Sequence, residues 1–365
     1  MSTKDLTVHY EGRECYHIIL TTDFSLLTSQ LEKAVGEDKS KKVCIISDSN
    51  VANLYINNLK EILENAYPIV ETFVFPAGEQ SKNIDTVQKL YEHLILNHFD
   101  RHDFLIALGG GVVGDLTGFT AATYLRGIDF VQVPTSLLAQ VDSSIGGKTG
   151  VDFQQYKNMV GAFFQPKLVY MNMEVFDTLP EEQFANGMAE EIKHGLIKDK
   201  AYYEYIRDHS NEIKGKNPEM MIELLNIGCN IKRVVVENDP KEKGERALLN
   251  FGHTIGHAIE KLSDFGLYHG QCVALGMVAA AYLSCKKGCI TKEELLDIEQ
   301  TIRLYDLPIR IQGYDKHEIL QTTKSDKKMI GNQIKFTLLK EIGNAYSDLS
   351  LTDADLLEAI DYVVN

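Results

Sequence analysis

The sequence predicts an α/β N-terminal domain with a mostly parallel sheet, followed by an all-α C-terminal domain. In the first half, short apolar runs alternate with helix-length segments, and from about Leu179 onward the pattern is almost purely helical. A chain of 365 residues also exceeds the length at which one hydrophobic core usually stops growing. We therefore expect two domains, residues 1–180 and 181–365.

Apolar runs of strand length occur four times in the first half, at 42–47, 69–75, 104–108 and 128–133. Segments of helical length lie between them, near 51–66, 83–97 and 112–124. Alternation of this kind favours a parallel sheet with helices on both faces. The second half is predicted to form helices at 181–198, 218–238, 248–262, 269–287 and 291–304, with one late strand at 334–339.

Composition excludes several classes of function. With 37 Lys and Arg against 52 Asp and Glu, the net charge of −15 argues against nucleic acid or an anionic membrane as the main partner. The six cysteines are scattered without a C-x-x-C pair, as in proteins whose thiols stay reduced. No apolar signal region begins the chain, and no apolar run is long enough to span a bilayer. We expect a soluble, cytoplasmic protein.

Two histidines point to a divalent metal. His253 and His257 are four residues apart, so on a helix they share one face, and His269 follows shortly after. A catalytic zinc site needs three protein ligands, and Glu190 or Glu191 on another predicted helix is a candidate for the third. Spacing alone also allows core or surface histidines with no ligand role.

A glycine-rich turn suggests a nucleotide. Gly109, Gly111 and Gly114 form G-x-G-x-x-G between a predicted strand and a predicted helix, the context of a Rossmann-like dinucleotide site. Asp129, at the distance where an acid usually binds the ribose, lies inside a predicted strand, so acids at other strand ends, Asp48 and Glu79, are candidates instead. The glycines alone would also suit a tight turn.

A set of bases lies beside these motifs. The sequence GGKT at 146–149 lacks the first glycine of a P-loop, which excludes nucleoside triphosphate hydrolysis of that kind. In an acidic chain, convergent cations suit a substrate with a phosphate and a carboxylate, although each alone also suits a solvated surface. The set consists of Arg126, Lys148, Lys157, Lys193, Lys232 and Arg246.

Long ordered motifs carry a resemblance that runs nearly end to end: PAGEQSK at 76–82, LGGGVVGDLTGF at 108–119, VPTSLLAQVDSSIGGKTGVD at 133–152, KNMVGAF at 157–163, GMAEEIKHG at 187–195 and LNFGHTIGHAIE at 249–260. On these motifs the chain resembles the sugar phosphate cyclases, and within them the 3-dehydroquinate synthase family. The family often has an apolar residue where Glu191 stands, and the extra charge leaves Glu190 as the ligand if Glu191 faces outward.

The resemblance implies a set of site residues. It makes Glu190, His253 and His269 the ligands of Zn²⁺ or Co²⁺ and moves His257 to the substrate, against the spacing argument. It implies an NAD site of Asp48, Asn50, Glu79, Lys82, Gly110, Gly111, Val112, Asp115, Thr135, Ser136, Asp142, Lys148, Lys157, Thr178 and Leu179. It implies substrate contacts from Asp142, Lys148, Asn158, Lys193, Lys232, Arg246, Asn250, His257 and one of Lys327 and Lys328, with Arg126 reaching in from the second subunit of a homodimer.

The implied reaction converts 3-deoxy-D-arabino-heptulosonate 7-phosphate to 3-dehydroquinate and phosphate through transient oxidation by NAD, β-elimination, re-reduction and an intramolecular aldol closure. Three alternatives stay open: another cyclase such as 2-deoxy-scyllo-inosose synthase or an epi-valiolone synthase, a related metal-dependent polyol dehydrogenase, and an inactive metal- or nucleotide-binding module. A carboxylate on the substrate would separate the 3-dehydroquinate synthase family from the other cyclases. Net release of NADH would indicate a polyol dehydrogenase. A complete set of ligand and cation positions argues against an inactive module.

Overall fold

The computed structural model of the chain describes residues 3–154, 156–242, 244–264, 266–324, 329–330 and 333–364. It divides into two compact units, each treated by itself below. Unit 1 consists of Met1–Leu179 with Pro218–Arg233, and unit 2 consists of Pro180–Asn217 with Val234–Asn365. Unit 2 thus begins at Pro180, and part of a later helix, Pro218–Arg233, belongs to unit 1.

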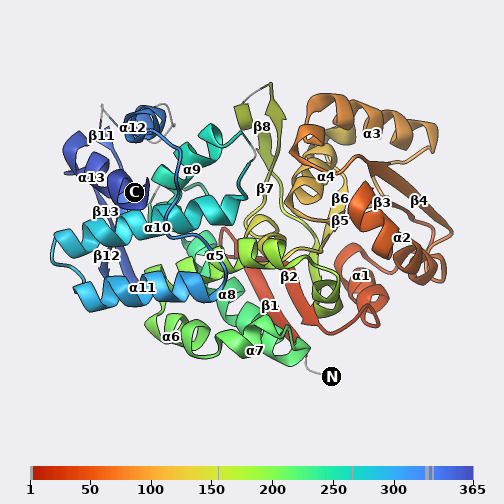
Figure 1. Cartoon of the computed structure of the whole chain (residues 1–365). Helices are drawn as coiled ribbons and strands as arrows, with labels where there is room; N and C mark the ends of the chain where they lie inside the picture. The colour runs from red at the N-terminus through yellow and green to blue at the C-terminus, as the bar shows by residue number, and fades with distance from the viewer. Residues whose placement is uncertain are drawn as a thin grey trace. The chain divides into compact units, whose positions relative to one another are not determined.

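Unit 1 is built on a seven-stranded sheet (Figure 1). From edge to edge its strands are β1 (Lys4–Tyr10), β2 (Arg13–Thr21), β9 (Leu168–Asn172), β6 (Asp129–Pro134), β5 (Phe104–Gly109), β3 (Lys42–Asp48) and β4 (Ile69–Phe75). Only β1 runs antiparallel to its neighbour. The four predicted strands are all present. The sequence reading missed β1, β2 and β9; β1 and the start of β2 carry polar, partly exposed residues.

Helices cover both faces of this sheet, because alternate residues of its central strands point in opposite directions. On one face, Ile45 and Ile106 pack with residues of α1 (Leu27–Val35) and α2 (Ser49–Glu64). On the other, Ile46 and Leu105 pack with residues of α3 (Ile84–Leu96) and α4 (Gly111–Thr123). Burial of both faces explains why these strands are continuous apolar runs in the sequence.

Further elements of unit 1 lie outside the sheet. The hairpin of β7 (Lys148–Phe153) and β8 (Tyr156–Phe163) is antiparallel. The short turns are η1 (Glu79–Ser81), η2 (Tyr124–Arg126), η3 (Ala139–Ser143, a π turn) and η4 (Met173–Asp177), and α8 (Pro218–Asn238) contributes its residues up to Arg233.

Unit 2 is largely helical, as predicted. Its helices are α5 (Glu181–Lys198), α6 (Lys200–Asp208), α7 (Ser210–Lys214), α9 (His253–Leu262), α10 (His269–Lys286), α11 (Lys292–Leu304), α12 (Lys316–Lys324) and α13 (Asp353–Val364), with the 3₁₀ turn η5 (Glu245–Asn250). The apolar helix α10 packs against α5, α9, α11 and α13. It therefore forms the core of the unit.

Two details differ from the predicted second domain. The predicted helix 248–262 begins only at His253, because Gly252 takes a left-handed conformation with φ of 79°. The predicted late strand is β12 (Phe336–Glu341), which pairs with β13 (Asn344–Asp348), and the short strands β10 (Met329–Ile330) and β11 (Gln333–Ile334) form another pair.

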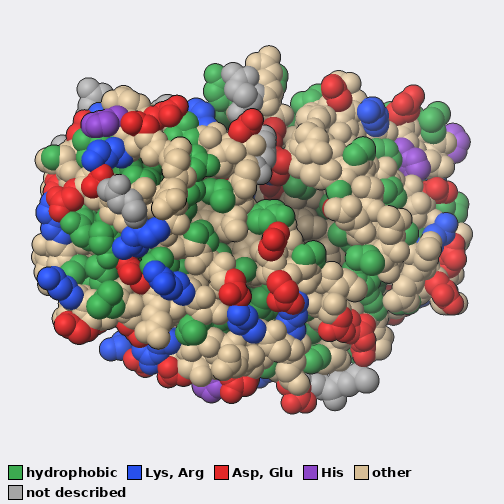
Figure 2. Space-filling view, in the orientation of Figure 1, with side chains coloured by type: hydrophobic (Ala, Val, Ile, Leu, Met, Phe, Trp, Pro, Cys, Tyr) green, Lys and Arg blue, Asp and Glu red, His purple; other side chains and the backbone are tan. Residues whose placement is uncertain are grey.

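Acidic and basic side chains are interspersed on the face of the molecule drawn in Figure 2. Within the part of the chain that the structure describes, no helix combines the length and apolarity that crossing a membrane requires.

Candidate active site

Close contact between two helices of unit 2 places the histidines. A Cβ atom added to Gly276 of α10 would lie 1.7 Å from the carbonyl oxygen of Gly252, just before α9. A Cβ atom on Gly252 itself would lie 2.8 Å from the backbone of Val273 and Met277. Only glycine fits at both positions, so α9 and α10 approach closely enough for His253 and His269, at their first residues, to face each other.

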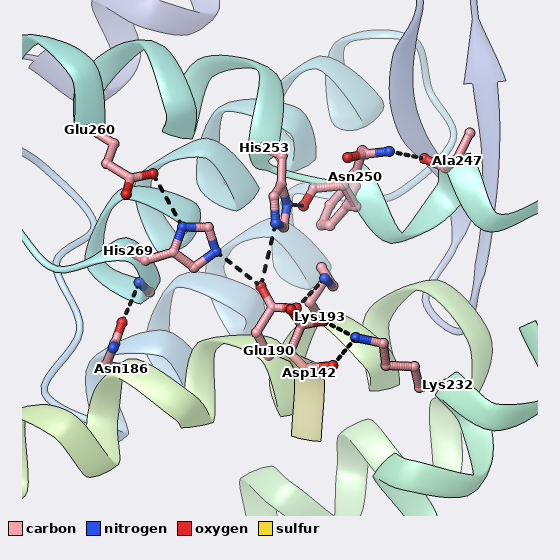
Figure 3. Close-up of polar contacts among 12 residues, drawn as sticks. Asp142, Asn186, Glu190, Lys193, Lys232, Ala247, Asn250, His253, Glu260 and His269 are labelled. Atoms are coloured by element: carbon pink, nitrogen blue, oxygen red, sulfur yellow. Dashed lines mark hydrogen bonds and ion pairs between the residues drawn. The ribbon is translucent and has the colours of Figure 1, made fainter. Parts of the chain in front are cut away.

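These two histidines converge on one carboxylate oxygen (Figure 3). The Nε2 atom of His253 lies 3.5 Å, and that of His269 lies 3.8 Å, from Oε1 of Glu190 on α5. Glu190 is fully buried, and its Oε1 accepts no hydrogen bond from the described residues. A buried carboxylate oxygen facing two imidazole nitrogens fits a divalent cation, because the cation would supply the missing partner.

The outer nitrogen of each imidazole already has a partner. Nδ1 of His253 lies 3.1 Å from the carbonyl oxygen of Phe251, and Nδ1 of His269 lies 3.2 Å from Oε2 of Glu260. An Nδ1–H that donates to these oxygens leaves the Nε2 lone pair free for a metal. Sequence reasoning missed Glu260 as a partner of the site, although it lies on the same helix as His253 and His257.

Charges around Glu190 favour its ionised form. Burial by itself would raise the pKa of Glu190, but the ammonium of Lys193, together with His269, holds it well below its usual range. Burial would lower the pKa of His269, but Glu190 and Glu260 raise it to about 10, so a metal that binds Nε2 of His269 must displace a proton. The carboxylate of Glu190 is therefore ionised and suits the role of an anionic metal ligand.

His257 also belongs to the cluster. Ligand atoms of His253, His257 and His269 all lie within 4.8 Å of one another. The geometry therefore admits His257 beside the other two histidines, as the spacing argument had it, and leaves open the substrate role that the resemblance implies.

Glu191 differs from expectation. It is fully buried rather than facing outward, and its carboxylate lies 3.5 Å from Nδ1 of His194, which is also fully buried. Burial raises the pKa of Glu191. The outward orientation is not found, because α5 is buried along nearly its whole length, from Phe184 to Ile197. Glu190 alone of the two acids faces the histidines.

The other predicted substrate residues of unit 2 lie in and beside η5. Arg246 is 3% exposed, and its guanidinium donates to the carbonyl oxygen of Pro240 at 2.9 Å. The side-chain amide of Asn250 donates to Glu242 at 2.9 Å and to the carbonyl oxygen of Ala247 at 3.2 Å. Lys327 and Lys328 lie outside the described residues.

Several predicted NAD residues of unit 1 lie at the carboxyl ends of parallel strands. In chain order, β3 is followed by β4, which pairs with one edge of β3. The next strand in the chain, β5, pairs with the opposite edge of β3. The strand order thus reverses between β3 and β5, and ligands of open α/β sheets bind at such a switch point. Asp48 ends β3, and Gly110 follows β5 as the N-cap of α4.

Local contacts explain several of these residues. Asp48 caps α2 by accepting from the backbone N–H groups of Asn50 at 2.8 Å and Val51 at 3.1 Å. A Cβ atom on Gly114 would lie 2.7 Å from the side chain of Gln132, so this glycine lets α4 pack on β6. The glycine motif therefore follows β5, with its helix N-terminus at the switch point.

Other predicted residues of unit 1 lie on α8, after β6, on the β7–β8 hairpin and at η2. Lys232 on α8 donates to the carboxylate and the backbone carbonyl of Asp142 (Figure 3). The hydroxyl groups of Thr178 and Tyr55 are hydrogen-bonded, Leu179 follows Thr178, and Thr135 and Ser136 follow β6. Lys148, Lys157 and Asn158 are exposed on the β7–β8 hairpin. Arg126 is exposed at η2, with φ of 68°.

Comparisons with known proteins agree with this arrangement. Residues 72–186 match the family described as 3-dehydroquinate synthase N-terminal, and residues 187–329 match 3-dehydroquinate synthase C-terminal. The 3-dehydroquinate synthase of Acetivibrio thermocellus is 42% identical over 356 residues, which cover 97% of this chain and 98% of that protein.

Solved structures extend the comparison. A 2-deoxy-scyllo-inosose synthase complexed with carbaglucose-6-phosphate, NAD⁺ and Co²⁺ is 25% identical with a TM-score of 0.88, and the match covers 100% of both chains. The 2-epi-5-epi-valiolone synthase of Streptomyces hygroscopicus, with NAD⁺ and Zn²⁺ bound, is 25% identical with a TM-score of 0.87 and covers 98% of this chain and 99% of that one. On both family matches and the full-length identity, this chain belongs to the 3-dehydroquinate synthase family.

Proposed function

We propose that the chain is a 3-dehydroquinate synthase. It is then a phosphate-eliminating carbon–oxygen lyase that converts 3-deoxy-D-arabino-heptulosonate 7-phosphate to 3-dehydroquinate and phosphate, in the shikimate route to aromatic amino acids. The observation that carries the proposal is the 42% identity, over 97% of this chain, with the 3-dehydroquinate synthase of Acetivibrio thermocellus. The convergence of His253 and His269 on Glu190 agrees with the metal that such a reaction needs.

Two bound groups supply the chemistry that side chains lack. NAD, when bound, would supply a hydride acceptor and donor for C5 of the substrate, and a bound Zn²⁺ or Co²⁺ would supply Lewis acidity at the C5 hydroxyl. Glu190, His253 and His269 would hold the metal. The predicted residues around the switch point of unit 1 would hold NAD.

The side chains of this chain bind and orient an anionic substrate. Arg246 and Lys232 would bind its carboxylate, because a guanidinium and an ammonium offer several charged donors. Asp142 and Lys193 would orient the ring hydroxyls. The phosphate would be held by Lys148, Asn158, Asn250, His257 and one lysine of 327–328. Most of the catalysis in this proposal is positioning and charge stabilisation.

The nearest alternative is another sugar phosphate cyclase, and the solved structures of two such enzymes have the same fold. Their identity to this chain is 25%, against 42% for the 3-dehydroquinate synthase of Acetivibrio thermocellus. A substrate without a carboxylate would also leave the buried Arg246 without its predicted partner.

The decisive experiment is phosphate release from the heptulosonate phosphate, with glucose 6-phosphate and sedoheptulose 7-phosphate as comparison substrates, at catalytic NAD and added Zn²⁺. We expect release only from the carboxylated substrate, with a carbocyclic product by NMR and no net NADH. Release only from a carboxylate-free sugar would instead assign another cyclase. Net NADH formation would assign a polyol dehydrogenase.

We also propose a homodimer in which Arg126 reaches the partner's site. Four large apolar side chains on the β7–β8 hairpin are 46–56% exposed, which is typical of a surface that another chain covers. These are Phe153, Tyr156, Met159 and Phe163. Mixing an Arg126→Ala chain with a chain inactivated at Glu190 should restore part of the activity, because one site of the mixed dimer then has both residues; no restoration would contradict the arrangement.

A cytoplasmic location completes the proposal. All six cysteines are free thiols in the structure, as expected in a reducing compartment. Fractionation of the source cells with an antibody to the chain tests it, and recovery from a membrane or secreted fraction would contradict it.

A further inference from the structure

The backbone of Asn158 on β8 is held in an unusual conformation. Its φ of 55° lies in the left-handed region, which costs free energy for any residue with a side chain. The N–H of Asn158 donates to Oδ1 of Asp152 at 2.7 Å, across the hairpin. Asp152 therefore compensates the strained position directly.

Lys82 closes a ring with these two residues. The N–H of Asp152 donates to the carbonyl oxygen of Lys82 at 2.8 Å, and the ammonium of Lys82 donates to Oδ1 of Asn158 at 2.6 Å. The same ammonium lies 2.6 Å from Oδ2 of Asp115 and 3.7 Å from Glu79. Lys82 is 4% exposed, so the ring is anchored to a buried, charge-paired group.

The ring fixes which end of the Asn158 amide is available to a ligand. An ammonium has donors and no acceptor, so it must face the amide oxygen and not the amide nitrogen. The NH₂ group of Asn158 is then directed away from Lys82, and Asn158 is exposed. An NH₂ group suits an anionic oxygen such as that of a phosphate, whereas the amide oxygen would repel it.

We propose that Asp152 is a positioning residue that holds Asn158 so that its side-chain amide donates to the substrate phosphate. The proposal rests on the proposed function, since Asn158 is a phosphate contact only there. Asp152 acts through Asn158 and Lys82 and does not itself touch the substrate. Asp152 ends the motif at 133–152, but the sequence does not show its contact with Asn158 and Lys82, because the ring joins residues from separate segments.

Steady-state kinetics and phosphate inhibition test the proposal. Asp152→Ala removes the acceptor for the N–H of Asn158, and we expect KM for the heptulosonate phosphate and Ki for inorganic phosphate to rise about tenfold, the effect of one lost hydrogen bond. Asp152→Asn keeps an oxygen acceptor and should stay within about threefold of wild type. The affinity for NAD, titrated without substrate, should change less than the phosphate Ki.

A double-variant comparison separates positioning from simple hairpin stability. Asn158→Gly keeps a backbone that tolerates positive φ and removes the amide. If Asp152 acts through Asn158, adding Asp152→Ala to Asn158→Gly raises the phosphate Ki no further. Additive losses, or an unchanged Ki in Asp152→Ala, would overturn the proposal.

Folding and function are checked in the same series. Thermal unfolding of each variant shows whether the protein is folded. If Asp152→Ala is not folded, the comparison is made with the conservative variant Asp152→Asn. Absence of phosphate release by the wild type would refute the proposed function. A normal wild type with normal Asp152→Ala kinetics refutes only the positioning role.

Discussion

Nε2 of His253 lies 3.5 Å from Oε1 of the fully buried Glu190, on a helix far away in the sequence. A carboxylate and an imidazole at this separation leave room for a metal ion bound to both, since Zn–N and Zn–O bonds are each about 2 Å long.

Removal of the metal should abolish activity. We expect dialysis against a chelator to remove one Zn²⁺ or Co²⁺ per chain and to stop phosphate release, and either ion to restore it. Glu190→Gln should retain little metal, because it loses the anionic ligand. Metal content by mass spectrometry checks this, and wild-type metal content and activity in Glu190→Gln would refute the ligand assignment.

Glu260 should increase the affinity of the site for the metal through its contact with His269. Its carboxylate fixes His269 through Nδ1 at 3.2 Å, so Glu260→Ala should weaken metal affinity about 10–100-fold. Competition with a metal-binding dye measures the affinity. Glu293→Ala, at an exposed glutamate of α11, is the matched control and should bind metal as the wild type does.

Arg246 should contribute more to the affinity for substrate than to the affinity for NAD. Arg246→Ala should raise KM for the heptulosonate phosphate about 100-fold or more, since it removes a charged donor for the carboxylate, and change the dissociation constant of NAD little. Arg246→Lys should recover part of the loss. Equal losses of substrate and NAD affinity would contradict the carboxylate role.

Gly276→Ala should destabilise unit 2. The new methyl group would meet the carbonyl oxygen of Gly252 and force α9 and α10 apart, at a cost of about 3 kcal/mol or more. The same displacement should move His253 away from Glu190 and lower metal affinity. Urea unfolding and metal titration check both effects, and a wild-type unfolding midpoint would show that the helices separate without cost.

Glu191 should make stability depend on pH. Because burial raises its native pKa above the ordinary 4.5, the native state keeps a proton that the unfolded state loses, and stability falls as pH rises from 4.5 toward the native pKa. The slope is at most about 1.4 kcal/mol per pH unit. Glu191→Gln cannot lose this proton, so urea unfolding from pH 4.5 to 8 should show a smaller decline than in wild type. Parallel profiles would contradict the raised pKa.

Elements with strong local signals were predictable from the sequence. The four buried strands were found because burial on both faces makes them continuous apolar runs, and α5 and α10 were found from their length and helical pattern. The start of the helix that carries His253 was placed too early, because the break depends on the left-handed backbone of Gly252. At this position Gly252 also lies against α10, where an added Cβ atom would be 2.8 Å from Val273 and Met277.

The candidate site was predictable only in part. Spacing on one helix indicated His253 and His257, and it could not choose between Glu190 and Glu191, which are adjacent on α5. The structure separates the two acids: Glu190 faces the histidines and Glu191 faces His194. The resemblance to the family supplied the remaining assignments, including His269, and those roles stay predictions.

The sequence by itself determined the segments that form strands and helices, the acidic balance, the glycine-rich turn and the residue types that the chemistry needs. Tertiary structure decided which of them meet: Glu190 with His253 and His269, Asp48 beside Gly110 at the reversal of strand order, and Asp152 with Asn158 and Lys82. The physical reason is that periodicity fixes only which side chains share a face of one element. Contacts between elements depend on how closely backbones pack, and here glycines such as Gly252 and Gly276 set that distance.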